Sequence, residues 1–116
     1  ADPRRTETAE AADPHLPLLP GTDVALYHGL LHLLMWEGLT DTAYIAAHTT
    51  GFEALRDRVR EFTPKHVAQV CGLKEDDIVQ AARWFGQNTP TLSLYCQGLN
   101  QSSSGTDKNA ALINLH

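Results

Sequence analysis

Cysteine is scarce in this chain of 116 residues. The two cysteines, Cys71 and Cys96, stand far apart and form no C-x-x-C pair. This spacing excludes a zinc site built on paired cysteines and a network of disulfides. Because disulfides are rare in the cytoplasm, we expect a cytoplasmic protein with reduced thiols.

Positive charge is also in short supply. Lys and Arg total 9 against 14 for Asp and Glu, which gives a formal net charge of -5. A chain with this balance lacks the broad basic surface that binds nucleic acids or anionic membranes, so neither is expected as a partner. No stretch reaches the roughly 18 consecutive apolar residues of a membrane-spanning helix. Any anionic ligand must therefore be held by a few local side chains.

Motifs for phosphate loops, nucleophiles and metals are missing too. There is no G-x-G-x-x-G, and no lysine directly follows Gly105 to complete a Walker pattern with Gly98. The serines at 102–104 lack the G-x-S-x-G turn of a serine nucleophile. His28 and His32 have a spacing that can bind zinc, but packing is the commoner role of histidines on an apolar helix. We therefore expect neither catalytic residues nor a metal site within this chain.

What the sequence does contain is a series of helix signals. From Val24 to Glu37 the residues are apolar nearly all round, and such a helix is usually buried, so it is predicted to form the core. Thr22 or Asp23 is a suitable N-cap for it, and Gly38 is a natural stop. Start and stop residues predict four further helices: from Thr40-Asp41 to Ala47, from Gly51 or Phe52 to Phe62, from Lys65 to Cys71 after Thr63-Pro64, and from Glu75 to Gly86.

The stretch from Thr91 to Gln101 predicts a strand that runs into a loop. A short β-favouring run follows Pro90, small and polar residues dominate from Gly98 to Gly105, and an apolar helical run resumes at Ala110. In open α/β sheets, ligands bind at a loop between the end of a strand and a helix N-terminus. Gln97 to Gly105 is therefore a candidate binding site, although many such loops only connect elements.

The first 13 residues hold almost no bulky apolar side chain and are predicted to be exposed. Within them, Arg4 and Arg5 present guanidinium groups whose planar donors suit phosphate or the edge of a base, with solubility as the alternative role. Asp2, Asp13 and Asp23 lie near turns or helix starts, where capping or turn formation is the ordinary explanation.

Few strands accompany these helices. His15 to Pro20 is predicted to be an edge strand or a buried extended connection, and any parallel sheet would need strands from outside the chain. The chain opens without methionine at Ala1 and stops at His116 within an apolar run, so we expect one domain, residues 1–116, cut from a longer protein. Its apolar central helix and unpaired strands predict self-association in isolation.

Several ordered motifs resemble those of one enzyme family. D-P-R-R-T begins at Asp2, P-G-T-D at Pro20 and G-L-N-Q at Gly98, and G-T-D-K-N follows from Gly105. Together they resemble the molybdopterin oxidoreductase (dimethyl sulfoxide reductase) family across essentially the whole chain. N-Q-S-S and T-D-K-N are most similar to the catalytic subunits of bacterial assimilatory nitrate reductases, whereas D-P-R and P-G-T-D are shared with formate dehydrogenases.

The resemblance implies an α/β fold: a helix-rich fragment, with few strands, of a Rossmann-like domain that binds molybdopterin guanine dinucleotide. It implies that the D-P-R-R-T segment embraces the nucleotide end of the cofactor and that the Asp23 carboxylate accepts hydrogen bonds from the guanine. It also implies that the loop from Gln97, where many relatives carry methionine, reaches the pterin and dithiolene end. The cofactor-binding residues expected on this basis are Asp2, Pro3, Arg4, Arg5, Thr6, Gly21, Thr22, Asp23, Gln97, Gly98 and Gln101.

For an intact enzyme, the resemblance implies reduction of nitrate to nitrite by oxygen-atom transfer, with the metal and its dithiolenes supplying the chemistry. The remainder of the enzyme and an electron donor would be the partners of this chain. The family's cysteine cluster for a 4Fe-4S centre, its molybdenum ligand and its nitrate pocket match nothing here, so the chain is expected to be inactive alone. A formate dehydrogenase fragment and a cofactor-free helical interaction module are the alternative interpretations.

Overall fold

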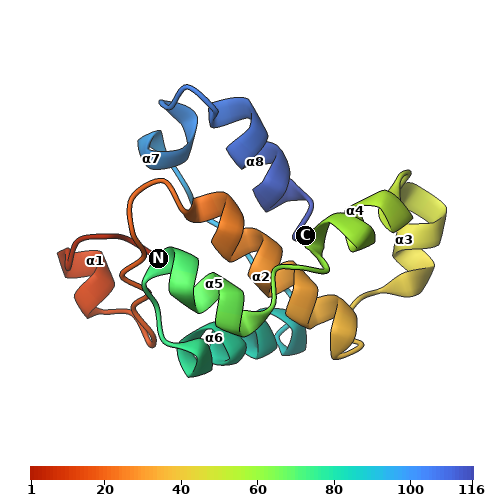
Figure 1. Cartoon of the computed structure of the whole chain (residues 1–116), viewed down its shortest axis with the longest axis horizontal. Helices are drawn as coiled ribbons and strands as arrows, with labels where there is room; N and C mark the ends of the chain where they lie inside the picture. The colour runs from red at the N-terminus through yellow and green to blue at the C-terminus, as the bar shows by residue number, and fades with distance from the viewer.

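Helices alone make up the regular structure of this protein. The computed structural model describes residues 1–116 and contains no β-strand (Figure 1). The expectation of a Rossmann-like α/β fold is therefore wrong for this chain. The helices are α1 (Glu7–Glu10), α2 (Asp23–Trp36), α3 (Thr42–His48), α4 (Phe52–Val59), α5 (Pro64–Cys71), α6 (Glu75–Gln87), α7 (Gln97–Asn100) and α8 (Gly105–Ile113).

The predicted strand after Pro90 is an extended segment without a partner. Residues 91–95 make no backbone–backbone hydrogen bond, and Leu92 and Leu94 are 80% and 87% exposed. A strand is stabilised by hydrogen bonds to a neighbouring strand. Because no part of this chain pairs with the segment, its β-favouring composition does not produce a strand.

The segment from His15 to Pro20 takes the second of its two predicted forms, a buried extended connection. Leu16 and Leu18 are buried in the core. The backbone N–H of Leu19 donates to the carbonyl of Cys71 at 2.9 Å, which ties the connection to the end of α5. This contact fixes the path by which the chain enters α2.

The buried central helix predicted from the apolar composition is α2. Figure 1 shows it running through the middle of the molecule, and it contacts α4, α5, α6 and α8. Gly38 follows it with a φ of 69°, in the left-handed region, and so ends the helix as predicted. Seven of its residues are buried: Leu26, Gly29, Leu30, Leu31, His32, Leu33 and Leu34.

The helices around α2 begin where their capping residues predict. Asp41 accepts a hydrogen bond from the backbone N–H of Tyr44 at 2.9 Å and starts α3. Thr63 accepts from the N–H of His66 at 3.4 Å and starts α5. These start signals are local in sequence, so they act whatever the tertiary contacts of the helix are.

Gly86 does not end α6 as predicted, because the helix continues through it to Gln87. A Cβ added at Gly86 would lie 2.6 Å from Cδ2 of Leu34. The glycine therefore allows α6 to pack closely against α2.

The two ends of the molecule differ. Figure 1 shows α3 and α4 projecting at one end, where no residue of α3 is buried. α1 and α7 lie toward the opposite end, and the start of α2 lies between them and the centre (Figure 1). None of the helices has the length and apolar character needed to cross a membrane. The predicted cofactor-binding residues lie in the N-terminal segment 2–6, in the turn and first helical residue at 21–23, and in or directly after α7.

Candidate functional site

Asp2 ties the N-terminal segment to the connection before α2. Its Oδ1 accepts from the backbone N–H of Arg4 at 2.8 Å. Its own N–H donates to the carbonyl of Leu16 at 3.1 Å, and its carbonyl lies 2.7 Å from Nε2 of His15. Asp2 therefore closes a turn around Pro3, and one oxygen of its carboxylate is already used within the chain.

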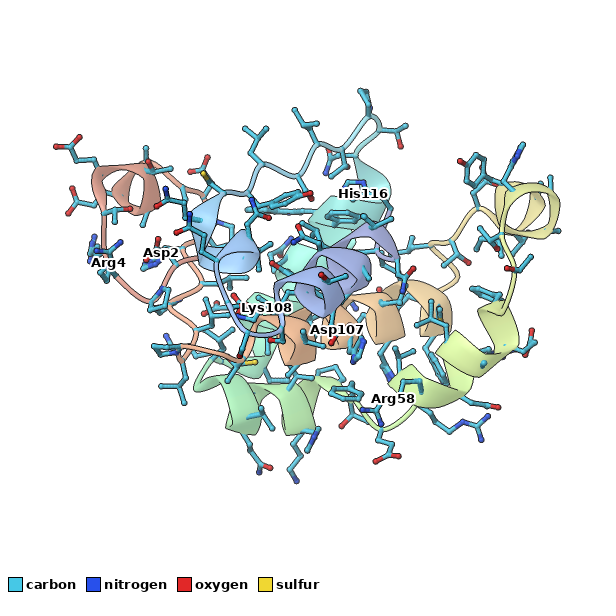
Figure 2. The ribbon with its side chains drawn as sticks, turned by 90° about the horizontal axis from the view of Figure 1, so that it is seen from above. Asp2, Arg4, Arg58, Asp107, Lys108 and His116 are labelled. Atoms are coloured by element: carbon cyan, nitrogen blue, oxygen red, sulfur yellow. The ribbon has the colours of Figure 1, made fainter.

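The two arginines point into solvent. The side chains of Arg4 and Arg5 are 84% and 78% exposed, and their nearest carboxylates, on Asp2 and Glu10, are 3.9 and 3.7 Å away. Exposed ion pairs contribute little to stability. Figure 2 shows Arg4 at the edge of the molecule. Both guanidinium groups are therefore available to an anionic ligand.

Thr6 has a structural partner. Its hydroxyl accepts from the backbone N–H of Ala9 at 3.2 Å and caps α1. Ala9 is the one buried residue among the first 13 residues, so this segment is otherwise as exposed as predicted.

The turn into α2 is closed by Gly21 and Thr22. Gly21 has a φ of 85°, which favours glycine. The hydroxyl of Thr22 donates to the carbonyl of Leu19 at 2.7 Å and makes no capping bond to α2. Asp23 is the first residue of the helix, where a carboxylate is favoured by the positive end of the helix dipole.

Asp23 pairs with Lys108, which belongs to the G-T-D-K-N motif but was not among the predicted binding residues. The Nζ atom of Lys108 lies 2.9 Å from Oδ2 of Asp23, and their side chains are 11% and 24% exposed. The pair joins the start of α2 to the first turns of α8. Oδ1 of Asp23 has no hydrogen-bond partner and is not sealed from solvent. One oxygen of this carboxylate is therefore free to accept a ligand.

The phenol of Tyr27 and the thiol of Cys71 lie close enough to Asp23 to be affected by its charge. Burial and the charge of Asp23 raise the pKa of Tyr27 to about 12. Burial is also the main cause of the raised pKa of Cys71, whose Sγ lies 3.7 Å from the carbonyl of Thr22. The phenol and the thiol therefore keep their protons at neutral pH and add no negative charge beside the carboxylate.

Gln97 to Asn100 form the short helix α7, where sequence reasoning expected a loop. Leu99 is buried and anchors this helix to the core. Gln97, Gly98 and Gln101 are exposed, and the two glutamine side chains make no hydrogen bond within the chain. Their amide groups are therefore free to contact a ligand.

Asn109 holds the loop between α7 and α8 closed. Its Nδ2 donates to Oδ1 of Asn100 at 3.1 Å and to the carbonyl of Gly105 at 2.8 Å. A Cβ at Gly105 would lie 2.5 Å from the backbone oxygen of Asn100, so only glycine fits this close approach. The clamp fixes the start of α8 and with it the position of Lys108.

The predicted residues lie in the half of the molecule that contains α1, α7 and the start of α2, and no single contact network joins them. In Figure 2, Asp2 and Arg4 lie toward the end of the molecule that contains α1, and Lys108 lies further toward the middle. Side-chain hydrogen bonds link the start of α2 to α8 through Asp23 and Lys108. No side-chain hydrogen bond or ion pair links the N-terminal segment to Asp23 or to α7.

An open hollow of about 590 Å³ lies close to the N-terminus, but none of the predicted residues lines it. Apolar side chains make up more than half of its lining. It is therefore not the predicted polar site. Its lining residues are Ala1, Pro14, Leu16, Ala81, Trp84, Phe85, Asn88, Pro90, Thr91 and Leu92.

Known proteins contain this segment within much longer chains. No family model matches the chain. A nitrate reductase of Synechocystis is 43% identical over 115 residues, 99% of this chain and 16% of the relative. The α subunit of an F420-dependent formate dehydrogenase of Methanocaldococcus jannaschii is 36% identical over 114 residues, 98% of this chain and 17% of the relative. The solved structure of an acetylene hydratase from Pelobacter acetylenicus superposes with a TM-score of 0.93 at 33% identity, over 98% of this chain and 16% of that one.

These proteins are named for three different reactions, yet each contains the segment. The segment therefore does not by itself determine the reaction. This chain spans about one sixth of the length of the relatives that it matches. The chain belongs to the molybdopterin oxidoreductase family, and almost its whole length is similar to one segment of the nitrate reductases and formate dehydrogenases of that family.

Proposed function

We propose that this chain is the cofactor-binding segment of a molybdenum-dependent nitrate reductase that reduces nitrate to nitrite. The 43% identity to a nitrate reductase over 115 residues carries this proposal. A formate dehydrogenase is the second candidate, because relatives of that name are 36% identical over 98% of the chain. A cytoplasmic location is part of the proposal and is supported by the free thiols of Cys71 and Cys96.

The donors and acceptors present suit a molybdopterin guanine dinucleotide. The free Oδ1 of Asp23 is an acceptor for the N1–H or amino group of guanine. The exposed guanidinium groups of Arg4 and Arg5 provide planar donors for a pyrophosphate. The unbonded amides of Gln97 and Gln101 are suited to the polar edge of a pterin.

These side chains would bind and orient the cofactor, and its molybdenum and dithiolenes would supply oxygen-atom transfer once bound. The rest of the enzyme, including a 4Fe-4S cluster outside this chain, and an electron donor complete the proposal. The family's molybdenum ligand and nitrate pocket match no part of this sequence, so we expect the isolated chain to be inactive.

Calorimetric titration of the chain with GMP tests the cofactor site. We expect weak binding that is lost in Asp23→Asn, because the amide replaces one acceptor oxygen of the carboxylate by an NH₂ donor and removes its negative charge. Asp76→Asn is the matched control, since Asp76 also lies in the first turn of a helix but is exposed and unpaired. Equal binding by Asp23→Asn and the unmodified chain would favour the cofactor-free interaction module.

Assays of the complete enzyme that contains this segment distinguish the two reactions. With a reduced dye as electron donor, we expect nitrate consumption and nitrite formation. Formate oxidation without nitrate reduction would replace the nitrate proposal by the formate one while leaving the cofactor site intact.

A further inference from the structure

Lys108 is the only buried residue of the chain with a charged side chain. Lysine is rarely buried, because removing an ammonium group from water is costly unless a partner compensates for the loss. Here the partner is Asp23, at 2.9 Å. The carboxylate that compensates for the burial of Lys108 is therefore the same one that is proposed to bind guanine.

The ammonium group of Lys108 has more donors than the protein uses. A lysine carries three N–H donors, and the structure shows one bond from Nζ, to Oδ2 of Asp23. The remaining donors lie beside a carboxylate whose other oxygen, Oδ1, is free. The pair therefore presents donors and acceptors side by side.

This order matches one edge of guanine. Guanine offers the acceptor O6 next to the donors N1–H and N2–H₂, whereas adenine offers a donor at N6 next to an acceptor at N1. Oδ1 of Asp23 and the second lone pair of Oδ2 can accept from the two guanine donors, and the ammonium beside Oδ2 can donate to O6. With adenine, the ammonium and the amino group would be two donors facing each other.

We propose that Lys108 determines base specificity by donating a hydrogen bond to O6 of the guanine that Asp23 binds. This inference rests on the proposed function, since it requires the cofactor's guanine at Asp23. The clamp of Asn109 on Asn100 and Gly105 supports it, because the clamp holds the start of α8 and so fixes where the Lys108 ammonium lies. The backbone N–H of Lys108 also donates to the carbonyl of Ser104 at 3.0 Å.

The test compares GMP with 6-thio-GMP, which keeps N1–H and the amino group but replaces O6 by sulfur, a weaker acceptor. Calorimetry on the unmodified chain should show about tenfold weaker binding of 6-thio-GMP, the loss expected for one hydrogen bond. Lys108→Met should bind the two nucleotides equally. Lys108→Arg, which keeps donors at this position, should retain a preference for GMP. Lys74→Met is the control, because Lys74 is exposed and outside the site, and it should keep the full preference.

The outcomes separate this inference from the proposed function. If the unmodified chain binds both nucleotides equally and Asp23→Asn abolishes that binding, the role of Lys108 is overturned and the guanine site stands. If GMP binding does not depend on Asp23, or is absent, the guanine site and the role of Lys108 both fail. Circular dichroism checks that each variant folds, and if Lys108→Met does not, the comparison of the two ligands on the unmodified chain decides.

Discussion

At the level of single residues, two glycines in helices have opposite surroundings. A Cβ at Gly29 in α2 would lie 2.7 Å from Cγ2 of Val67, whereas a Cβ at Gly98 in α7 would meet nothing within 4 Å. Neither glycine has a positive φ, so backbone strain plays no part at either site. The difference between them is a difference in packing alone.

We expect Gly29→Ala to destabilise the fold by about 1–3 kcal/mol, because the added methyl overpacks the contact between α2 and α5. Urea unfolding followed by circular dichroism measures this. Gly98→Ala is the matched control and should leave stability unchanged or slightly higher, because alanine favours a helix. The double variant Gly29→Ala, Val67→Ala should lose less free energy of unfolding than the sum of the losses in the two single variants, because the shorter side chain at 67 makes room for the added methyl. Equal stability of Gly29→Ala and the unmodified chain would contradict the close packing of α2 on α5.

His28 makes stability depend on pH. Burial, and to a lesser extent the positive charge of Arg58, lowers the pKa of His28 below 6.5. Its Nδ1 is buried without a partner, and its ring packs edge-on against Phe62 with centroids 4.7 Å apart. Since the unfolded chain binds the proton more readily, the contribution of His28 to stability is complete above its unfolded pKa and is lost as pH falls through 6.5 toward the folded pKa.

We therefore expect the free energy of unfolding to fall between about pH 7 and pH 5, and His28→Gln to reduce the slope of that fall. Urea titrations at several pH values measure this slope, which is not changed by a pH-independent loss of stability from the missing ring. His48→Gln, on the exposed face of α3, is the control and should leave the slope unchanged. A slope that His28→Gln does not alter would show that other groups account for the pH dependence.

At the level of elements, the capping residues of α3 and α5 support very different amounts of structure. α5 contributes Val67 and Cys71, both fully buried, to the core. α3 contributes no buried residue at all. We therefore expect the cooperative fold to depend on α5 but not on α3.

We expect Thr63→Ala to lower global stability by about 1 kcal/mol, the usual cost of losing an N-cap. Asp41→Ala removes the shorter capping bond, at 2.9 Å, yet should change global stability less, because α3 can fray while the core remains intact. Hydrogen exchange resolves the two cases: protection should drop only within α3 for Asp41→Ala. Loss of protection throughout the core in that variant would mean that α3 is part of the cooperative unit.

The contrast between caps and strands explains what sequence could predict. The helix starts at Asp41 and Thr63 depend on side chains three residues from the groups that they bind, so the pattern is visible in a short window. The segment containing Leu92 and Leu94 has strand composition, but a strand also needs a distant partner, and none is present in this chain. The prediction that Gly86 ends α6 is wrong because the atom that requires a glycine there belongs to Leu34, in another helix.

At the level of the whole molecule, the sequence predicts which segments form the candidate site, namely D-P-R-R-T, P-G-T-D and the residues from Gln97 to Gln101, but not how they are arranged in space. Asp23 was identified through P-G-T-D, yet its partner Lys108 lies 85 positions away. No periodicity or capping rule connects residues at that separation. The only signal available was the presence of both residues in motifs of one family, and a motif assigns no contact.

The exposed apolar residues of the whole molecule predict self-association of the isolated chain. Leu92 and Leu94 are 80% and 87% exposed in an extended segment whose backbone groups at 91–95 have no backbone partner. Such an edge can pair with another copy.

We expect sedimentation velocity to show association that increases with concentration and that weakens in the Leu92→Ser, Leu94→Ser double variant. Ile113→Ser, which removes a 64% exposed apolar residue from a helix with satisfied backbone bonds, should leave association unchanged. A chain that stays monomeric at every concentration would show that this edge is too weak to recruit a copy, whereas association that only Ile113→Ser reduces would place the contact on α8.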